Sequence, residues 1–191
     1  MSGDRDRTNS PHGRSGTAPA TLDHAGIAAR VPHAGSMCLL ERLLRWDDAS
    51  IECAIVNHAD PSHPLRDHAH VQDGGNKDGG EGEDLGLPSP TAIEFAAQAM
   101  ALHASLTAAE GAQPTPGFLA SARDVRLHVP RLDTAPGPLV VKAHRLAGDV
   151  RQAMYRFELA DAGGRLLVEG RTTVVLNTPL PRPGPAAAQA A

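Results

Sequence analysis

The sequence predicts an α+β fold in which one antiparallel sheet wraps around a single long central helix. Only residues 87–106 combine the length and the apolar content of a long helix. Stretches that alternate apolar and polar residues, a pattern typical of half-buried strands, lie on both sides of it. The late connections are too short for parallel crossovers, so neighbouring strands are expected to run antiparallel. A sheet wrapped around the helix buries its apolar faces economically.

Length and composition favour one domain with polar tails. The chain has 191 residues and is 41% hydrophobic and 3% aromatic, so its core must come mainly from Ala, Val, Leu and Ile. The folded domain is expected at residues 23–177. Residues 1–22 and 178–191 are expected to be disordered tails. Residues 67–86, rich in Gly and acidic residues, are expected to be a flexible surface insertion.

Charge and apolar pattern limit the classes of partner. The net charge of −4 gives no electrostatic reason to expect nucleic acid or an anionic membrane. The first 20 residues lack the apolar run of a signal peptide, and no stretch is long enough to cross a membrane, so we expect a cytoplasmic protein. Cys38 and Cys53 have no metal-ligand spacing and are expected to be small core residues.

Alternating patterns place two strands before the long helix and four after it, the last four expected as a meander. A short helix is also expected at Ile27–Val31. The expected strands are Met37–Trp46, Ser50–Asn57, Gly117–Val129, Leu139–Leu146, Arg151–Leu159 and Arg165–Leu176.

The long helix carries the clearest chemical signal. Ser89 followed by Pro90 predicts the helix start, with Ser89 as the cap. A capping box of Thr91 and Glu94 is the alternative. Glu94 and Gln98 interrupt the apolar pattern one turn apart. Because a carboxylate in a buried helix is costly unless it is used, Glu94 is interpreted as a general acid whose pKa is raised by desolvation.

Several motifs resemble those of hotdog-fold 3-hydroxyacyl-[acyl-carrier-protein] dehydratases. Pro32-His33 with Met37–Arg42 resembles their opening, and Leu87-Pro88 with Ile93–Gln98 resembles the start of their helix. Gly117–Ala120 and Leu167–Gly170 follow in the family's order, so the resemblance covers about residues 27–176. The phrases PHAGSM.LL and IE.AAQAM are similar to those of the dehydratase-like proteins of aryl-polyene biosynthetic clusters.

The resemblance implies a hotdog fold and an active site made of a helix Glu and a His, assembled by dimers from both subunits. In the matched motifs, the helix Glu of the family corresponds to Glu94, and the Gln that follows it corresponds to Gln98. The family's GHFP motif is missing, and Asp60–Arg66 stands in its place. The candidate histidines are therefore His33, in the matched opening motif, and then His63. His103 is expected to be a packed or interfacial histidine on the opposite side of the helix.

Dehydration of a 3-hydroxyacyl thioester needs a base, an acid and donors for the thioester oxygen. Free N–H groups between Ser89 and Glu94 are expected to supply those donors. Pro88, Ser89 and Gln98 are the expected substrate-binding residues. No cofactor or metal is expected, because the His and Asp residues between positions 58 and 70 fit no standard zinc spacing. A metal site there is the less favoured alternative.

The function expected from the resemblance is dehydration of 3-hydroxyacyl chains on acyl carrier protein to trans-2-enoyl thioesters. The acidic carrier is expected to meet a basic patch, with Arg123, Arg126 and Arg131 as candidates. Strand alternation places Arg123 and Arg126 on opposite faces. The chain is expected to form a homodimer, or a heterodimer with another hotdog protein. The alternatives are an acyl thioesterase and a non-catalytic subunit that partners an active dehydratase, of which the missing motif favours the second.

Overall fold

The computed structural model describes residues 20–68, 84–108, 117–149 and 151–176. Most of the two expected tails and residues 69–83 of the expected insertion lie outside this part. The two ends of the insertion, β3 (Asp67–His68) and β4 (Asp84–Gly86), pair antiparallel. Leu22, expected at the end of the N-terminal tail, forms an isolated bridge with Leu43.

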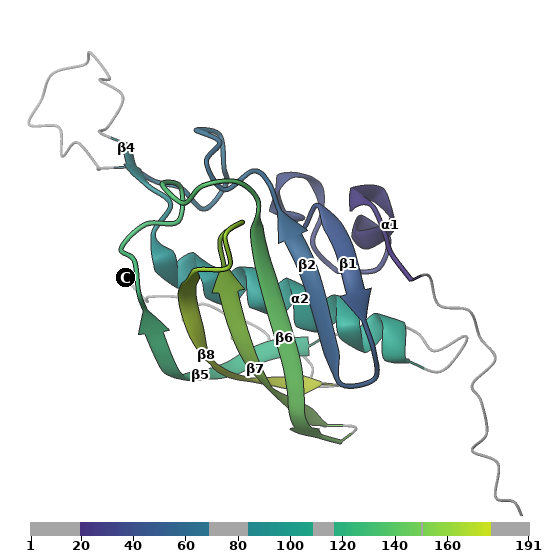
Figure 1. Ribbon diagram of the computed structural model, residues 1–191. Helices are drawn as coiled ribbons and strands as arrows, with labels where there is room; N and C mark the ends of the chain where they lie inside the picture. The colour runs from purple at the N-terminus through teal and green to yellow at the C-terminus, as the bar shows by residue number, and fades with distance from the viewer. Residues whose placement is uncertain (1–19, 69–83, 109–116, 150, 177–191) are drawn as a thin grey trace, which may run out of the picture.

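In the described part of the chain, one six-stranded antiparallel sheet and one long helix form the core of the fold, as the sequence predicts. The helix α2 (Ala92–Thr107) crosses one face of the sheet (Figure 1). The strand order is β1 (Arg42–Trp46), β2 (Ser50–Ile55), β6 (Leu139–Gly148), β7 (Gln152–Ala160), β8 (Leu166–Leu176) and β5 (Gly117–Leu127).

The expected meander of four consecutive strands is wrong for its first strand. Strands β6, β7 and β8 are neighbours in chain order, but β5 pairs with β8 at the far edge of the sheet. The connection from β5 to β6 is not a hairpin, and it carries the fully buried Leu132. It therefore packs against the core as it crosses from one edge strand to the middle of the sheet.

The segment before β1 is less extended than expected. Gly35–Met37 forms a 3-10 turn, and Cys38, Leu39 and Leu40 are buried loop residues, so β1 begins only at Arg42. The short helix also lies earlier than expected. It spans His24–Ala28, because the Asp23 side chain accepts the Gly26 N–H at 2.9 Å and so caps its start.

The helix α2 is buried along most of its length. Phe95, Met100 and Leu102 pack into the core between the helix and the sheet. Cys38 and Cys53 are buried free thiols, as expected for core residues, and burial raises the pKa of Cys53 to about 12. Within the described residues, no helix has the length and apolar character needed to span a membrane.

His103 joins the far end of α2 to the sheet, and its expected packed position is confirmed. Its Nε2 lies 2.8 Å from the Asp47 carbonyl oxygen, and its Nδ1 lies 2.9 Å from the Tyr155 hydroxyl. Because a carbonyl only accepts, Nε2 carries the proton and Nδ1 accepts from the hydroxyl. Burial lowers the pKa of this histidine, so the neutral form is favoured in the fold.

Candidate active site

The start of α2 is built differently from both capping expectations. A 3-10 turn, Ser89–Thr91, precedes the α-helix, with Pro90 inside it. The Ser89 hydroxyl is buried and has no hydrogen-bond partner within the described chain, so it caps nothing. The Thr91 hydroxyl donates to the Pro88 carbonyl at 2.7 Å instead of capping the helix. Glu94 is therefore not the second member of a capping box.

Glu94 pairs with His33, the histidine that the matched opening motif favoured. The His33 Nε2 lies 3.1 Å from the Glu94 Oε1, and the two side chains are 27% and 33% exposed. Glu94 is thus less buried than an all-apolar helix suggests, and the pair is accessible from outside. The chain reaches His33 from Pro32, whose ring restricts the backbone of the loop that follows α1.

Gln98 holds this pair in place from one turn further along α2. Its Nε2 donates to the Glu94 Oε1 at 3.0 Å and to the Met37 carbonyl at 2.8 Å. Its Oε1 accepts the Leu39 N–H at 2.9 Å. The fully buried amide therefore uses both of its N–H groups within the chain and has no donor left for a ligand. Its contacts fit a positioning role better than the expected substrate-binding one.

His63 lies near the same helix start but does not pair with Glu94 within the described chain. Its ring meets the ring of Phe95 edge-on, with centroids 5.9 Å apart. Its Nδ1 accepts the Leu65 N–H at 3.2 Å, so Nε2 carries the proton in the neutral form. That Nε2 is buried without a partner in the described chain, and burial lowers the pKa of the ring.

The N–H groups expected to bind the thioester oxygen are mostly engaged elsewhere. The Ser89 N–H donates to the Pro130 carbonyl at 3.0 Å, and the Thr91 N–H donates to the Pro88 carbonyl at 3.1 Å. The Ala92 N–H donates to the carbonyl oxygens of Ser89 and Pro90 in the 3-10 turn. The expectation is therefore wrong for these three groups, because the tight turn satisfies the N–H groups of Thr91 and Ala92, and the distant Pro130 carbonyl satisfies that of Ser89. Pro88 itself forms an isolated bridge with Arg131.

Two of the three candidate arginines for the basic patch are paired with acidic residues. Arg131 binds Asp133, and Arg126 lies 3.5 Å from Glu169. The expected opposite faces of Arg123 and Arg126 are wrong. A register shift around Asp124, whose φ is 51°, places both on the outer face, opposite Arg171 and Glu169 of β8.

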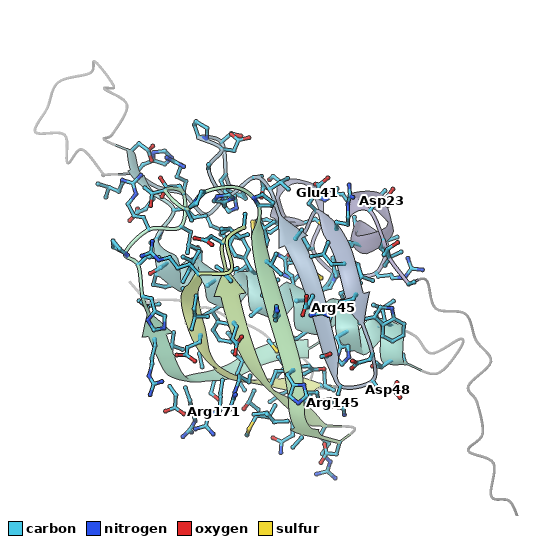
Figure 2. The ribbon with its side chains drawn as sticks, in the orientation of Figure 1. Asp23, Glu41, Arg45, Asp48, Arg145 and Arg171 are labelled. Atoms are coloured by element: carbon cyan, nitrogen blue, oxygen red, sulfur yellow. The ribbon has the colours of Figure 1, made fainter. Side chains whose placement is uncertain are left out.

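Arg123 instead belongs to a row of basic residues that crosses the outer face of the sheet. The register aligns His144, Arg156, Arg171 and Arg123 on four neighbouring strands. Arg171 binds Asp124, and Figure 2 labels it near the lower end of the sheet. This row lies on the face of the sheet turned away from α2.

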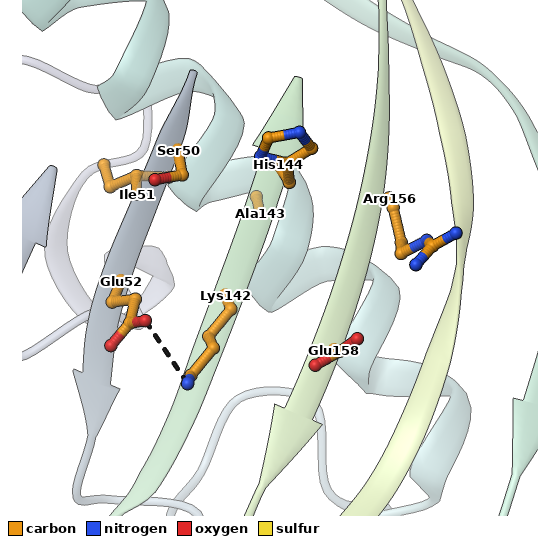
Figure 3. A pocket seen from close by; sticks show the side chains of 8 residues that line it. All are labelled: Ser50, Ile51, Glu52, Lys142, Ala143, His144, Arg156 and Glu158. Carbon is orange, nitrogen blue, oxygen red and sulfur yellow. Dashed lines mark ion pairs between the residues drawn. The ribbon is translucent and has the colours of Figure 1, made fainter. Parts of the chain in front are cut away.

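A shallow hollow on the same outer face is separate from the candidate site. Figure 3 shows Glu52 and Lys142 side by side there, with their charged atoms 3.3 Å apart, and His144 and Arg156 nearby. None of the candidate site residues lines it. No group of three or more His, Cys, Asp or Glu residues with metal-binding geometry occurs in the part of the chain that the structure describes.

Comparison with known proteins decides the family. A model of the ApeP-like family, described as ApeP dehydratase, matches residues 25–181. The chain belongs to this family. Membership confirms the resemblance to the dehydratase-like proteins of aryl-polyene biosynthesis. No curated protein sequence matches the chain significantly.

Solved structures agree with this ApeP-like assignment. The chain is similar to the dehydratase heterocomplex ApeI:P from Xenorhabdus doucetiae, with 25% identity, a TM-score of 0.59, and coverage of 80% of this chain and 91% of that one. It is also similar to the thioesterase HI1161 from Haemophilus influenzae, with 12% identity, a TM-score of 0.53, and coverage of 84% and 94%. The second likeness shows the hotdog fold alone.

Proposed function

We propose that this ApeP-like chain itself dehydrates 3-hydroxyacyl thioesters carried on acyl carrier protein, giving trans-2-enoyl thioesters. One observation carries the proposal: a carboxylate and an imidazole lie 3.1 Å apart, partly exposed, at the start of the central helix. This reaction needs one group that takes a proton and one that gives a proton. Glu94 and His33 supply both within a single chain.

The proposed reaction needs only the substrate, His33 and Glu94, and it consumes no other reactant. Nε2 of neutral His33, whose buried Nδ1 carries the ring proton, takes the proton from the carbon next to the thioester carbonyl, and the electrons of that bond form the carbon–carbon double bond. The bond to the 3-hydroxyl breaks, and protonated Glu94 gives its proton to the departing oxygen, which leaves as water. The imidazolium then returns a proton to the carboxylate across the hydrogen bond between them. The pair is thereby restored to its starting state.

Gln98 is proposed to keep the pair aligned during these steps. It binds Glu94 directly, and through the Met37 carbonyl and the Leu39 N–H it also fixes the segment that follows the His33 loop. One buried side chain therefore sets the position of both partners. Such alignment matters because displacement of a catalytic group by about 1 Å can cost about a hundredfold in rate.

The first prediction tests the two groups separately. We expect Glu94→Gln to lower kcat by at least about a hundredfold, because general acid catalysis contributes on this scale. His33→Gln should give a similar loss, whereas His63→Gln should lose less than about threefold if His33 is the base. The measurement is enoyl product by mass spectrometry. Glu41→Gln is the control, since Glu41 is a half-exposed carboxylate outside the candidate site, 3.9 Å from Nδ1 of the half-exposed His24.

A second candidate function is a non-catalytic subunit that partners an active dehydratase. Two observations favour a partner of the hotdog kind. One of the similar solved structures is the dehydratase heterocomplex ApeI:P. In this chain, Leu119 and Leu127 of the edge strand β5 are 43% and 48% exposed, although they pair with Val174 and Val168, which face the core. An apolar inner surface is thus uncovered at the edge of the sheet.

The second prediction tests the partner surface. Leu119→Glu should abolish assembly with a second hotdog chain, because it places a charge on an apolar surface that the partner would cover. The measurement is the molar mass by light scattering after chromatography. Met154→Glu is the matched control, since Met154 is similarly exposed but lies on the outer face of β7. Equal behaviour of the two variants would rule out β5 as the contact.

A further inference from the structure

A cluster of two arginines and two aspartates lies beside the start of α2. The side chains of Arg66 and Asp133 are only 7% and 6% exposed. Arg66 donates to both Asp84 oxygens, at 2.7 and 2.6 Å, and its Nη2 lies 3.3 Å from the Asp133 Oδ2. Arg131 Nε donates to the Asp133 Oδ1 at 3.0 Å. A buried carboxylate is therefore held by two guanidinium groups, which offset the cost of its burial.

Asp133 also binds the backbone that leads into α2. Its Oδ1 accepts the Leu87 N–H at 2.9 Å. The Leu87 carbonyl accepts the Leu132 N–H at 2.8 Å, and the Ser89 N–H donates to the Pro130 carbonyl at 3.0 Å. Three hydrogen bonds thus join this short segment to the connection between β5 and β6. Asp133 supplies the one bond among the three that comes from a side chain.

The same cluster fixes the neighbouring backbone on both sides. Gly86 has a φ of +84°, and a Cβ there would overlap the Arg131 guanidinium. The Arg66 N–H donates to the His63 carbonyl at 3.0 Å, so the cluster also reaches the loop that carries His63. The position of the helix start is therefore set from outside the helix, by two backbone hydrogen bonds and by the charged cluster around Asp133.

We propose that Asp133 is a positioning residue for the Glu94–His33 pair, acting through Leu87 and the turn that begins α2. This inference rests on the proposed dehydratase function. Asp133 touches neither member of the pair. Asp133 holds Leu87, which begins the five-residue segment 87–91 that leads into α2. Loss of the Asp133 carboxylate therefore displaces Glu94 relative to His33 without removing either group.

The third prediction uses Asp133→Asn, measured with the full chain and any partner that co-purifies with it. Asn keeps an oxygen for the Leu87 N–H but loses the charge through which Arg66 and Arg131 anchor this side chain, so Leu87 is no longer held to a fixed point. We expect kcat to fall tenfold to about a hundredfold with KM changed less than about twofold, because alignment is lost while substrate binding is kept. Asp84→Asn is the control, since it removes a charge from the same cluster but does not contact Leu87.

Deuterium exchange over residues 87–95 is measured in the same variants, because it does not depend on activity. Gly86 is left out, since Asp84 accepts its N–H. Faster exchange in Asp133→Asn than in Asp84→Asn supports the inference even if the wild-type chain proves inactive, in which case the proposed function alone fails. Equal exchange in the two variants, or a kcat within twofold of wild type in folded Asp133→Asn, overturns it. If Asp133→Asn does not fold, Asp133→Glu replaces it, because it keeps the charge but moves the carboxylate away from Leu87.

Discussion

At the scale of single residues, the site depends on one amide that makes three hydrogen bonds. Gln98→Ala leaves the Leu39 N–H and the Met37 carbonyl without this partner in a buried region and frees Glu94. The fourth prediction is a loss of about 2–4 kcal/mol in the free energy of unfolding, since each unpaired buried group costs about 1–3 kcal/mol. Urea unfolding measures it. A loss below about 0.5 kcal/mol, within the range of ordinary surface substitutions, would contradict the account.

The candidate site was partly predictable at this scale. Glu94 stood out because a carboxylate interrupts an apolar helix, and His33 because it lies in the matched opening motif. The sequence carries no comparable signal for Asp133 or Arg66. Their importance comes from long-range contacts, across 46 residues to Leu87 and 67 residues to each other, which no local pattern encodes.

At the scale of elements, His103 ties the C-terminal half of α2 to the turn between β1 and β2 and to β7. His103→Phe leaves the Asp47 carbonyl and the Tyr155 hydroxyl without this partner. The fifth prediction is therefore that His103→Phe lowers the free energy of unfolding by about 1–3 kcal/mol at neutral pH. Burial lowers the pKa of His103 in the folded state below its ordinary value near 6.5. As the pH falls below 6.5, the unfolded chain therefore binds more protons at this residue than the folded chain does.

The direction of the lowered pKa determines how the contribution of His103 to the free energy of unfolding changes with pH. The His103 contribution is fully present above the unfolded-state pKa and is lost as the pH falls below it. Wild type should thus lose more stability than His103→Phe between about pH 7 and pH 5. The pKa of His63 is also lowered, so His63 adds a pH dependence of the same direction to the stability of wild type and of His103→Phe alike. Parallel stability curves for the two proteins over this range would refute the assignment.

At the scale of the whole molecule, the alternating strands and the apolar helix predicted the sheet and its central helix. The position of β5 was not predicted, because strand order depends on pairing between distant segments, such as Gly117 with Leu176. The start of α2 was also not predicted in detail. Ser89 and Pro90 favour a helix start, but the contact of Ser89 with Pro130 decides its geometry. Local signals thus identify elements, and long-range pairing arranges them.

The central claim is that this chain carries its own catalytic pair. The most direct test incubates a 3-hydroxyacyl-carrier-protein with the purified chain alone and follows the mass of the acyl group. The account predicts the loss of one water, abolished in Glu94→Gln and retained in Glu41→Gln. An unchanged mass, with the protein folded and the substrate intact, would contradict it and leave the non-catalytic subunit as the better description.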